Sequence, residues 1–310
     1  MTALVTLFGG GGFLGRYVAQ ELLKAGARVR LAERDPKRAW FVKTLGGLGQ
    51  TQFAAADITK ADSVARVVAG SDAVINLVGI LKGDFDSLHV AGARNIAEAA
   101  RDAGVGALVQ VSAIGADATA ESHYARSKGE GEAAVRAAFP NATIIRPSII
   151  FGPEDQFVNR FANMARLPVL PVIRGQAKFQ PVFVADVARA IAMAALDPTT
   201  FGGRTFELGG PETISMADLN AWIAKAAGRD PAILQIPDQA ARLMARIGGW
   251  APGAPITWDQ WLMLQKDNVV GAGAEGFAAF GIQPSPLEAI APGWLVQYRR
   301  HGRFAKPSAA

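Results

Sequence analysis

The sequence contains no cysteine, and this absence excludes several kinds of chemistry. The chain cannot form a disulfide, a thiolate metal site or an iron–sulfur cluster, and it has no cysteine nucleophile. Histidine is scarce as well. The sequence has three, at His89, His123 and His301, and they are too scattered to form a recognisable metal-binding motif. We therefore expect no metal site.

Long hydrophobic runs are also missing. No uncharged apolar segment reaches the roughly 18 residues that a membrane-spanning helix needs, and Ala73–Leu81 is about half that length. The first residues lack the basic start and small-residue cleavage site of a signal peptide. We expect a cytoplasmic protein, which could lie peripherally on the inner face of the cytoplasmic membrane.

Charge is modest but uneven. The 310 residues carry 32 basic and 27 acidic side chains, for a formal charge of +5. Two segments, Arg160–Lys178 and Arg299–Lys306, contain basic residues and no acidic ones. Neither shows the interleaved aromatic and basic pattern of a nucleic-acid module, so we expect no nucleic-acid partner. With 50% hydrophobic residues, the chain has ample material for a buried core.

Short apolar runs alternate with segments of helical periodicity in the first half of the chain. This alternation predicts right-handed strand–helix–strand units and a doubly wound parallel sheet, an α/β fold. The expected strands are Ala3–Phe8, Arg28–Ala32, Gln52–Ala55, Ala73–Val78, Ala107–Ser112 and Thr143–Ile150, and the expected helices are Phe13–Lys24, Ala61–Val68, Ser87–Ala103 and Ser122–Ala138.

The pattern becomes irregular after Gly152, which predicts a smaller mixed C-terminal domain. We expect residues 1–154 and 178–200 in the larger domain, and residues 155–177 and 201–310 in the smaller one. The expected elements here are helices at Phe157–Arg166 and Asp186–Leu196 and strands at Phe179–Val184 and Arg204–Leu208, with possible helix starts at Asp186, Ser215, Thr257 and Ser285.

A glycine-rich loop separates the first strand from the first helix. Gly9, Gly12 and Gly15 have the spacing G-x-x-G-x-x-G, and the residues between them include Gly10 and Gly11. A turn that approaches a pyrophosphate and packs a helix on a strand favours residues without a Cβ, and the helix N-terminus offers N–H groups to phosphate. We therefore predict a dinucleotide-binding Rossmann domain; the alternative is a tight turn with no ligand.

The end of the second strand should decide between the two nicotinamide dinucleotides. Glu33 occupies the position that binds the ribose hydroxyl of NAD, whereas Arg34, Lys37 and Arg38 suit the additional phosphate of NADP. We favour NADP(H), with NAD(H) as the alternative. Asp57 either accepts from the adenine amino group or is a solvated turn residue. The other expected cofactor contacts are Phe13, Leu14, Ile58, Val78 and Gly79.

Tyr124 and Lys128 lie four residues apart, on one face of an expected helix. Ser112 ends the preceding strand, at the edge of the sheet where ligands bind in such folds. A tyrosine with an ordinary pKa is a poor base at neutral pH, and a nearby ammonium can lower its pKa. We expect Ser112 to hold the substrate oxygen and Tyr124 to pass the proton while hydride moves to or from nicotinamide.

These features resemble the extended, or atypical, short-chain dehydrogenase/reductases. Within them, the chain is most similar to the group around the 39-kDa accessory subunit of complex I (NADH:ubiquinone oxidoreductase) and its bacterial relatives. The resemblance rests on the stretches Val111–Ala113, Ser122–Lys128, Gly131–Pro140, Arg146–Asp155, Gln180–Asp186, Leu208–Pro211 and Thr257–Asn268. It implies that the backbone around Pro147, Ile149 and Ile150 faces the nicotinamide carboxamide, and that Tyr124 and Lys128 also contact the cofactor.

One position departs from the family pattern. Many active members have an asparagine in a motif N-V-x-G-T-x-N that supports a proton relay to the lysine, and here His89 takes its place. Histidine can relay protons. The other interpretation is that the chain holds its nucleotide without turning it over.

Two classes of function therefore remain open. One is an NADP(H)-dependent oxidoreductase acting on a small hydrophobic carbonyl or alcohol. The other is a nucleotide-holding accessory subunit or assembly factor of respiratory complex I or of quinone metabolism. Trp250, Trp258, Trp261 and Trp294 could serve an interface or a small core. The basic run at Arg299–Arg303 is the candidate contact for a respiratory membrane complex or an anionic membrane surface.

Overall fold

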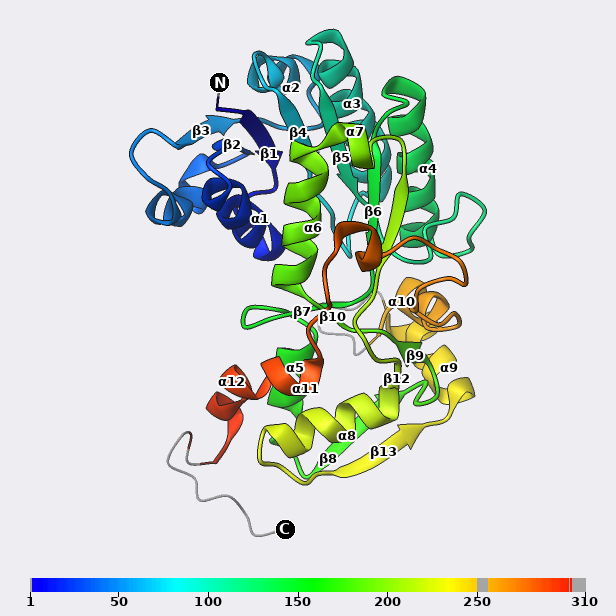
Figure 1. Ribbon diagram of the computed structural model, residues 1–310. Helices are drawn as coiled ribbons and strands as arrows, with labels where there is room; N and C mark the ends of the chain where they lie inside the picture. Colours follow the sequence, from blue (N-terminus) through cyan, green and yellow to red (C-terminus); the bar gives the residue numbers. More distant parts are fainter. Residues whose placement is uncertain (1, 250–255, 301, 303–310) are drawn as a thin grey trace. The chain divides into compact units, whose positions relative to one another are not determined.

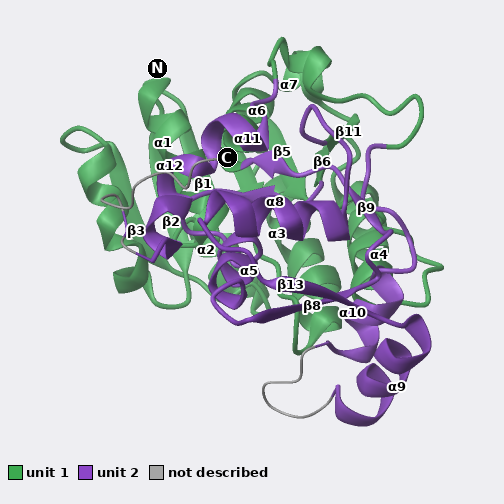
Figure 2. Cartoon of the chain, turned by 90° about the horizontal axis from the view of Figure 1, so that it is seen from below, with its two compact units in different colours: residues 1–147, 184–208, 271–283 green, residues 148–183, 209–270, 284–310 purple. Residues whose placement is uncertain are grey.

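The computed structural model describes residues 2–249, 256–300 and 302. The chain forms two compact units (Figure 2), of which unit 1 comprises residues 1–147, 184–208 and 271–283 and unit 2 comprises residues 148–183, 209–270 and 284–310. Within the described residues, no helix combines the length and apolar character needed to span a bilayer.

Unit 1 is built on a seven-stranded sheet with the order β11-β6-β5-β4-β1-β2-β3, and all its pairings are parallel. Its strands are β1 (Leu4–Phe8), β2 (Arg28–Glu33), β3 (Thr51–Ala55), β4 (Ala73–Asn76), β5 (Ala107–Val111), β6 (Thr143–Pro147) and β11 (Thr205–Leu208). The central strands β4 and β5 are buried along their whole length, as expected when helices cover both faces. This confirms the expected Rossmann-like α/β fold.

Helices cover both faces of this sheet (Figure 1). They are α1 (Phe13–Lys24), α2 (Ala61–Val68), α3 (Gly92–Asp102), α4 (His123–Ala138), α6 (Val184–Leu196) and α7 (Pro198–Phe201), with 3-10 helices η1 (Pro36–Leu45) and η3 (Phe277–Phe280) and a π-helical segment η2 (Asp86–Ala91) that runs into α3. Helices α1 and α6 pack together on one face, while α2, α3 and α4 cover the other.

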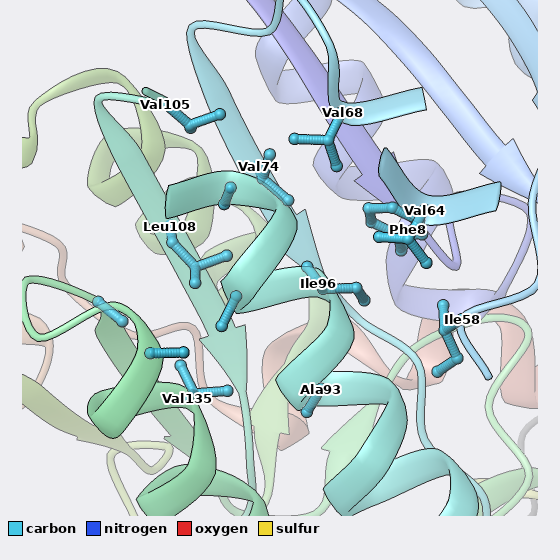
Figure 3. Packing of buried hydrophobic residues seen from close by; sticks show 14 of the residues in the cluster. Phe8, Ile58, Val64, Val68, Val74, Ala93, Ile96, Val105, Leu108 and Val135 are labelled. Atoms are coloured by element: carbon cyan, nitrogen blue, oxygen red, sulfur yellow. The ribbon is translucent and has the colours of Figure 1, made fainter. Parts of the chain in front are cut away.

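The core between the sheet and helices α2–α4 fixes the strand ends that form the site. Phe8, Val74 and Leu108 project from neighbouring strands toward Ile96 of α3 and Val135 of α4 (Figure 3). Each of these five side chains is at most 1% exposed. Burial of an aliphatic or aromatic side chain contributes about 1.5–3 kcal/mol, so this cluster anchors the strands to the helices on this face of the sheet.

Unit 2 contains short paired strands and helices. Its strands are β7 (Ile150–Phe151) paired with β10 (Val182–Phe183), β8 (Val169–Ile173) with β13 (Ala232–Ile236), and β9 (Lys178–Phe179) with β12 (Ile214–Ser215). Its helices are α5 (Val158–Met164), α8 (Met216–Ala226), α9 (Asp238–Gly248), α10 (Trp258–Met263), α11 (Leu287–Ile290), α12 (Pro292–Leu295) and the 3-10 helix η4 (Val296–Tyr298). Phe151, Leu219 and Ile223 lie at the centre of its largest core.

The division into units differs from the domain boundaries expected from the sequence. Residues 201–208 and 271–283 lie in unit 1, and β11 completes the large sheet by pairing in parallel with β6. Residues 148–154 and 178–183 lie in unit 2. Strand pairing between distant segments determines these boundaries, and local composition does not reveal it.

The expected helix starts had mixed outcomes. Ser215 accepts the N–H of Asp218, and Thr257 forms a reciprocal capping box with Gln260, so these two are confirmed. Asp186 is not an N-cap, because α6 begins two residues earlier at Val184. The start at Ser285 was also wrong, because α11 begins at Leu287 with Pro286 in the capping position.

The tryptophans of the last third have different environments. Trp261 is 8% exposed and belongs to a core, whereas Trp258 stacks on it and remains 37% exposed. Trp294 packs against Phe151 within unit 2. Trp250 lies outside the described residues, as do His301, Arg303 and Lys306 of the basic C-terminal run.

Candidate functional site

The glycine loop connects β1 to α1 with a backbone that tolerates little else. Gly9 has a φ of +81°, and a Cβ there would lie 3.3 Å from the carbonyl carbon of Leu77. A Cβ at Gly15 would collide with the carbonyl oxygen of Gly9 and lie 2.6 Å from the Cα of Gly10. The loop therefore packs too closely for side chains at Gly9 and Gly15, while Gly12 is exposed and can approach a ligand with its backbone.

Helix α1 starts at this loop without a side-chain cap. Gly12 is the N-cap, and the first helical residues are Phe13 and Leu14. The N–H groups of the first helical turn have no partner within the helix and carry a partial positive charge, so they suit an anionic group. The residues predicted to hold a pyrophosphate are thus assembled at one helix start.

Glu33 ends β2 and turns toward the glycine loop. Its Oε1 accepts the N–H of Gly11 at 2.6 Å. Burial raises the pKa of this carboxyl group, while the Gly11 hydrogen bond and the charge of Arg34 oppose the rise. Arg34 and Arg38 are exposed, and the guanidinium of Arg38 lies 3.7 Å from the carboxylate of Asp35. The acidic and basic candidates therefore occupy adjacent positions, with the carboxylate held against the loop.

Asp57 closes its own turn after β3. Its Oδ1 accepts both the hydroxyl and the N–H of Thr59, and these bonds, with smaller contributions from Lys60 and Arg34, lower its pKa. The side chain of Ile58 belongs to the core, and its carbonyl accepts from Asn95 at 2.8 Å. Any contact of Ile58 with a cofactor would therefore involve its backbone.

Lys128 projects from α4 toward the ends of β4 and β5. Its Nζ donates to the carbonyl oxygen of Val111 at 3.3 Å, and a Cβ at Gly79 would lie 3.3 Å from the same Nζ. Next to Gly79, Val78 donates its N–H to the side-chain oxygen of Asn76 at 3.0 Å. The structure thus brings Lys128 to the strand ends that the sequence predicted for cofactor binding.

Tyr124 lies one turn before Lys128 on the same helix, whose N-cap is Ser122. The Lys128 Nζ is 6.0 Å from the centre of the Tyr124 ring. Burial raises the pKa of Tyr124 to about 12 and lowers that of Lys128 to about 8, although Glu132 acts in the opposite direction on the lysine. At neutral pH the phenol therefore keeps its proton.

Ser112 follows β5 directly and is 4% exposed. Its backbone N–H donates to Ile145, but the structure gives its buried Oγ no hydrogen-bond partner among the described residues. A buried hydroxyl without a partner is costly, so this group is suited to bind a ligand atom.

His89 lies next to Tyr124, and both of its ring nitrogens are hydrogen bonded. Its Nε2 accepts the N–H of Ile80 at 3.0 Å, so Nδ1 carries the proton and donates it to the Ser127 hydroxyl at 2.9 Å. The ring also stacks on Phe85, and the edge of Tyr124 meets it at 5.6 Å between ring centres. Burial, assisted by the charge of Lys128, lowers the pKa of His89 to about 3.

This arrangement bears on the two interpretations of His89. The neutral imidazole has one lone pair, on Nε2, and the Ile80 N–H occupies it. In this state His89 cannot accept a proton from Lys128. Sequence reasoning missed the partners Ile80, Phe85 and Ser127. Ile80 and Phe85 belong to no recognisable motif, and Ser127, although it lies between Tyr124 and Lys128, has no local signal that pairs it with His89.

A partly buried ion pair connects α4 to the sheet. Arg146 of β6 makes two parallel hydrogen bonds to Glu132, at 2.9 and 2.7 Å, and a third bond of 3.3 Å to Glu207 of β11. Because Glu132 lies one turn after Lys128, this network links the lysine-bearing helix to two strands of the sheet. No local pattern in the sequence indicates this network.

The segment predicted to face nicotinamide is divided between the units. Pro147 ends β6 in unit 1, where its carbonyl accepts from Ile114 at 3.1 Å. Ile149 and Ile150 belong to unit 2, and the N–H of Ile149 donates to the side-chain oxygen of Asn268 at 3.1 Å. Their contact with a cofactor stays a prediction.

The NAD dependent epimerase/dehydratase family matches residues 4–209, which cover the glycine loop, Ser112, Tyr124 and Lys128. The chain belongs to this family. The match spans all of the large sheet and the predicted cofactor and catalytic residues of unit 1. Membership makes the chain a relative of NAD(P)-binding oxidoreductases and agrees with the resemblance found in the sequence.

Proteins similar to this chain are named for different functions. NADH dehydrogenase (ubiquinone) 1 alpha subcomplex subunit 9 of Mus musculus is 36% identical, over 92% of this chain and 78% of its own length. Ceramide reductase of Caulobacter vibrioides is 35% identical, over 63% of this chain and 62% of its own. The family thus includes both a respiratory-complex subunit and a reductase at similar identity to this chain.

A solved structure shows the same fold. The NADPH-dependent quinone oxidoreductase QOR2 of Escherichia coli, complexed with NADPH, superposes with a TM-score of 0.75 at 19% identity and covers 93% of this chain and 98% of its own. The residues described above fit a nicotinamide dinucleotide. The glycine loop has no room for a Cβ at Gly9 or Gly15, and the buried Ser112 hydroxyl, which has no partner among the described residues, follows the Val111 carbonyl that Lys128 contacts.

Proposed function

We propose that this chain binds NADP(H) in unit 1 and transfers hydride between nicotinamide and a small hydrophobic carbonyl or alcohol through Ser112, Tyr124 and Lys128. The observation that carries the proposal is the buried Ser112 hydroxyl, which has no hydrogen-bond partner among the described residues although it follows the strand that Lys128 contacts. Family membership and the fold support the nucleotide; the residues at the strand ends support the chemistry.

The residues divide the work of carbonyl reduction. Bound NADPH would supply the hydride to the carbonyl carbon. The Ser112 hydroxyl donates a hydrogen bond to the carbonyl oxygen, and Tyr124, protonated at neutral pH, gives that oxygen its proton. The Lys128 ammonium then stabilises the phenolate until a proton returns from solvent.

The choice of NADP(H) over NAD(H) rests on the β2 corner. Arg34 is exposed and close enough to Asp57 to influence its pKa, so a further phosphate would find positive charge there. Glu33 is held by the Gly11 N–H, which fixes the direction of its carboxylate. Titration of the purified protein with NADPH and NADH, followed by nicotinamide fluorescence, tests this assignment, and tighter binding of NADH would contradict it.

A second function is favoured by His89. Its only lone pair is used by Ile80, so the position of the family's relay cannot accept a proton from Lys128 in this state. That observation, together with the relative named as a subunit of NADH dehydrogenase, supports a nucleotide-holding accessory subunit or assembly factor of a respiratory complex. Such a role would place the protein at the inner face of the cytoplasmic membrane.

Turnover separates the two functions. We expect the purified protein to oxidise NADPH with some member of a panel of hydrophobic ketones and quinones, and Tyr124→Phe to abolish oxidation while NADPH binding stays within about threefold. Tyr298→Phe, which removes a hydroxyl hydrogen bonded to Asn159 in unit 2, is the matched control. Bound NADPH that no member of the panel oxidises would instead establish the accessory role.

A further inference from the structure

Helix α9 (Asp238–Gly248) packs through its small residues and exposes its large apolar ones. Ala241 and Ala245 are at most 2% exposed and belong to a core that also contains Trp261. By contrast, Leu243 is 58% exposed and Ile247 is 66% exposed. An ordinary surface helix has the opposite arrangement, because burying a large apolar side chain is more favourable than burying alanine.

The exposed apolar residues form one continuous stripe. Ala240, Leu243, Met244 and Ile247 have the spacing i, i+3, i+4 and i+7, which places them on one side of an α-helix. Met244 is 41% exposed. We call these four residues the α9 stripe. A contiguous exposed apolar stripe indicates a contact surface, whereas single apolar residues scattered over a surface do not.

The charge beside the stripe is positive. Arg242 and Arg246 are exposed and share a second side of the helix, next to the α9 stripe. The one acidic residue of the helix, Asp238, accepts from the Trp261 indole at 3.2 Å and lies 3.8 Å from Arg174. The sequence from residue 239 to residue 258 contains no acidic residue.

We propose that α9 lies in the headgroup region of an anionic lipid membrane, with the α9 stripe at the acyl boundary. Arg246 then reaches a lipid phosphate, since long basic side chains extend along an apolar surface with their charge in the polar layer. The guanidinium of Arg242 lies 5.7 Å from the centre of the Trp261 ring and adds positive charge to the same flank. The combination of a single convex helix about 16 Å long, an apolar side and a basic flank suits a lipid surface. A protein groove would have to match four apolar side chains while neutralising two charges.

This surface differs from the basic C-terminal run that the sequence suggested. The Arg299 side chain packs against Gly228, where a Cβ would meet its Cγ at 3.1 Å, and its Nε is buried. The membrane contact proposed here belongs to α9, which has both apolar and charged exposed groups. It does not depend on whether the site in unit 1 turns over.

Co-sedimentation with vesicles tests the proposal. We expect the full chain to bind vesicles of phosphatidylglycerol and phosphatidylcholine, and to bind pure phosphatidylcholine at least about tenfold less tightly. Leu243→Gln/Ile247→Gln should weaken binding by about tenfold or more, and Arg246→Gln by a smaller factor that vanishes in high salt. The matched control is Leu48→Gln/Leu81→Gln, two leucines of unit 1 that are 107% and 65% exposed.

Unchanged binding by Leu243→Gln/Ile247→Gln overturns the proposal, as does failure of the wild-type chain to bind the anionic vesicles. Self-association without lipid that this double variant abolishes would identify a second copy as the partner of α9 and would likewise overturn it. Because the replaced residues are exposed, circular dichroism and NADPH titration should match the wild type.

A site-specific probe gives a second measurement. The chain has no cysteine, so Met244→Cys introduces a single thiol for an environment-sensitive fluorophore. We expect its emission to shift to the blue on addition of anionic vesicles, while the same label at Leu81→Cys does not respond. Equal responses at both positions would contradict insertion of α9.

Discussion

The Nδ1 of His89 and the hydroxyl of Ser127 are hydrogen bonded at 2.9 Å, and this bond joins η2 to α4 within unit 1. The other ring nitrogen holds the N–H of Ile80, so one imidazole connects the segment after β4 to the helix that carries Tyr124 and Lys128. The ring is 2% exposed. Its role in the described state is to position these segments.

Replacing His89 should therefore destabilise unit 1. In His89→Ala, the Ile80 N–H loses its partner, the Ser127 hydroxyl keeps only its bond to the Tyr124 carbonyl, and a cavity forms. We therefore expect the free energy of unfolding to fall by roughly 2–4 kcal/mol. Urea denaturation measures this. His123→Ala, which changes an exposed histidine of the same region, should cost less than about 0.5 kcal/mol.

The same histidine predicts an acid dependence of stability. Its pKa is lowered to about 3 in the folded state, from the usual 6.5, chiefly by burial. Between pH 3 and pH 6.5 the unfolded chain binds a proton at this histidine that the folded chain does not. The stability gained by burying the neutral imidazole is therefore fully present above pH 6.5, and it is lost as the pH falls toward 3. His89→Ala should flatten the unfolding free energy across this window; an identical slope would contradict the assignment.

Lys128 should reduce stability at neutral pH. Burial lowers its pKa from 10.5 to about 8, so the folded chain bears the cost of a buried ammonium below pH 8 and recovers stability as pH rises toward 10.5. We expect Lys128→Met to raise the unfolding free energy at pH 7 by roughly 1–3 kcal/mol and to abolish NADPH oxidation. Lys43→Met, at an exposed lysine, should change neither.

Gly15 should be indispensable for the loop. A methyl group there must displace Gly9 and Gly10, so Gly15→Ala should cost about 1–3 kcal/mol of stability and weaken NADPH binding. Gly293→Ala is the control, because a Cβ at this position has no atom within 4 Å. Isothermal titration calorimetry measures the affinity of both variants for NADPH. Equal affinities of Gly15→Ala and Gly293→Ala would contradict a role of the loop in binding.

Two arginine–glutamate pairs, each linked by two hydrogen bonds, differ in the burial of the glutamate, and Arg146 has a further bond to Glu207. Arg146 and Glu132 are linked by two hydrogen bonds with the glutamate 7% exposed, whereas Arg204 and Glu275 are linked by two hydrogen bonds with the glutamate 50% exposed. We expect Glu132→Gln to lower the unfolding free energy by about 2–4 kcal/mol, and Glu275→Gln to lower it far less because water screens an exposed pair. Equal losses in thermal unfolding would refute this difference.

The regular part of unit 1 could be predicted from sequence because its signal is local. The amphipathic periodicity of α1 and α2 gave their bounds to the residue, and the strands were placed within one or two residues except at Thr143–Ile150, where β6 ends at Pro147. Helix η1 has no such periodicity, so it was not anticipated. In unit 2, β8 alternates between buried and exposed positions, but its sequence VLPVI is apolar throughout and contains Pro171. Strand β13 is largely exposed although four of its five residues are apolar, so neither sequence shows the alternation of apolar and polar residues expected of a strand.

Only the part of the candidate site that has a local sequence signal could be predicted. Ser112, Tyr124 and Lys128 follow from motif spacing along adjacent elements. The partners that hold His89 lie 9 and 38 residues away in the chain, and the Arg146 network joins residues as far as 61 apart. Such contacts depend on tertiary packing, which a single sequence does not encode in any local pattern.

The π-helical turn of η2 makes the site sensitive to chain length. A π turn contains one residue more per turn than an α-helix, and here the change occurs just before α3. Deleting one residue after His89, such as Ala91, would extend regular α-helix backward and rotate His89 by about 100° around the axis. The imidazole would leave Ser127 although no residue of the site had been replaced, so an insertion or deletion in this turn can exchange the side chain that faces α4.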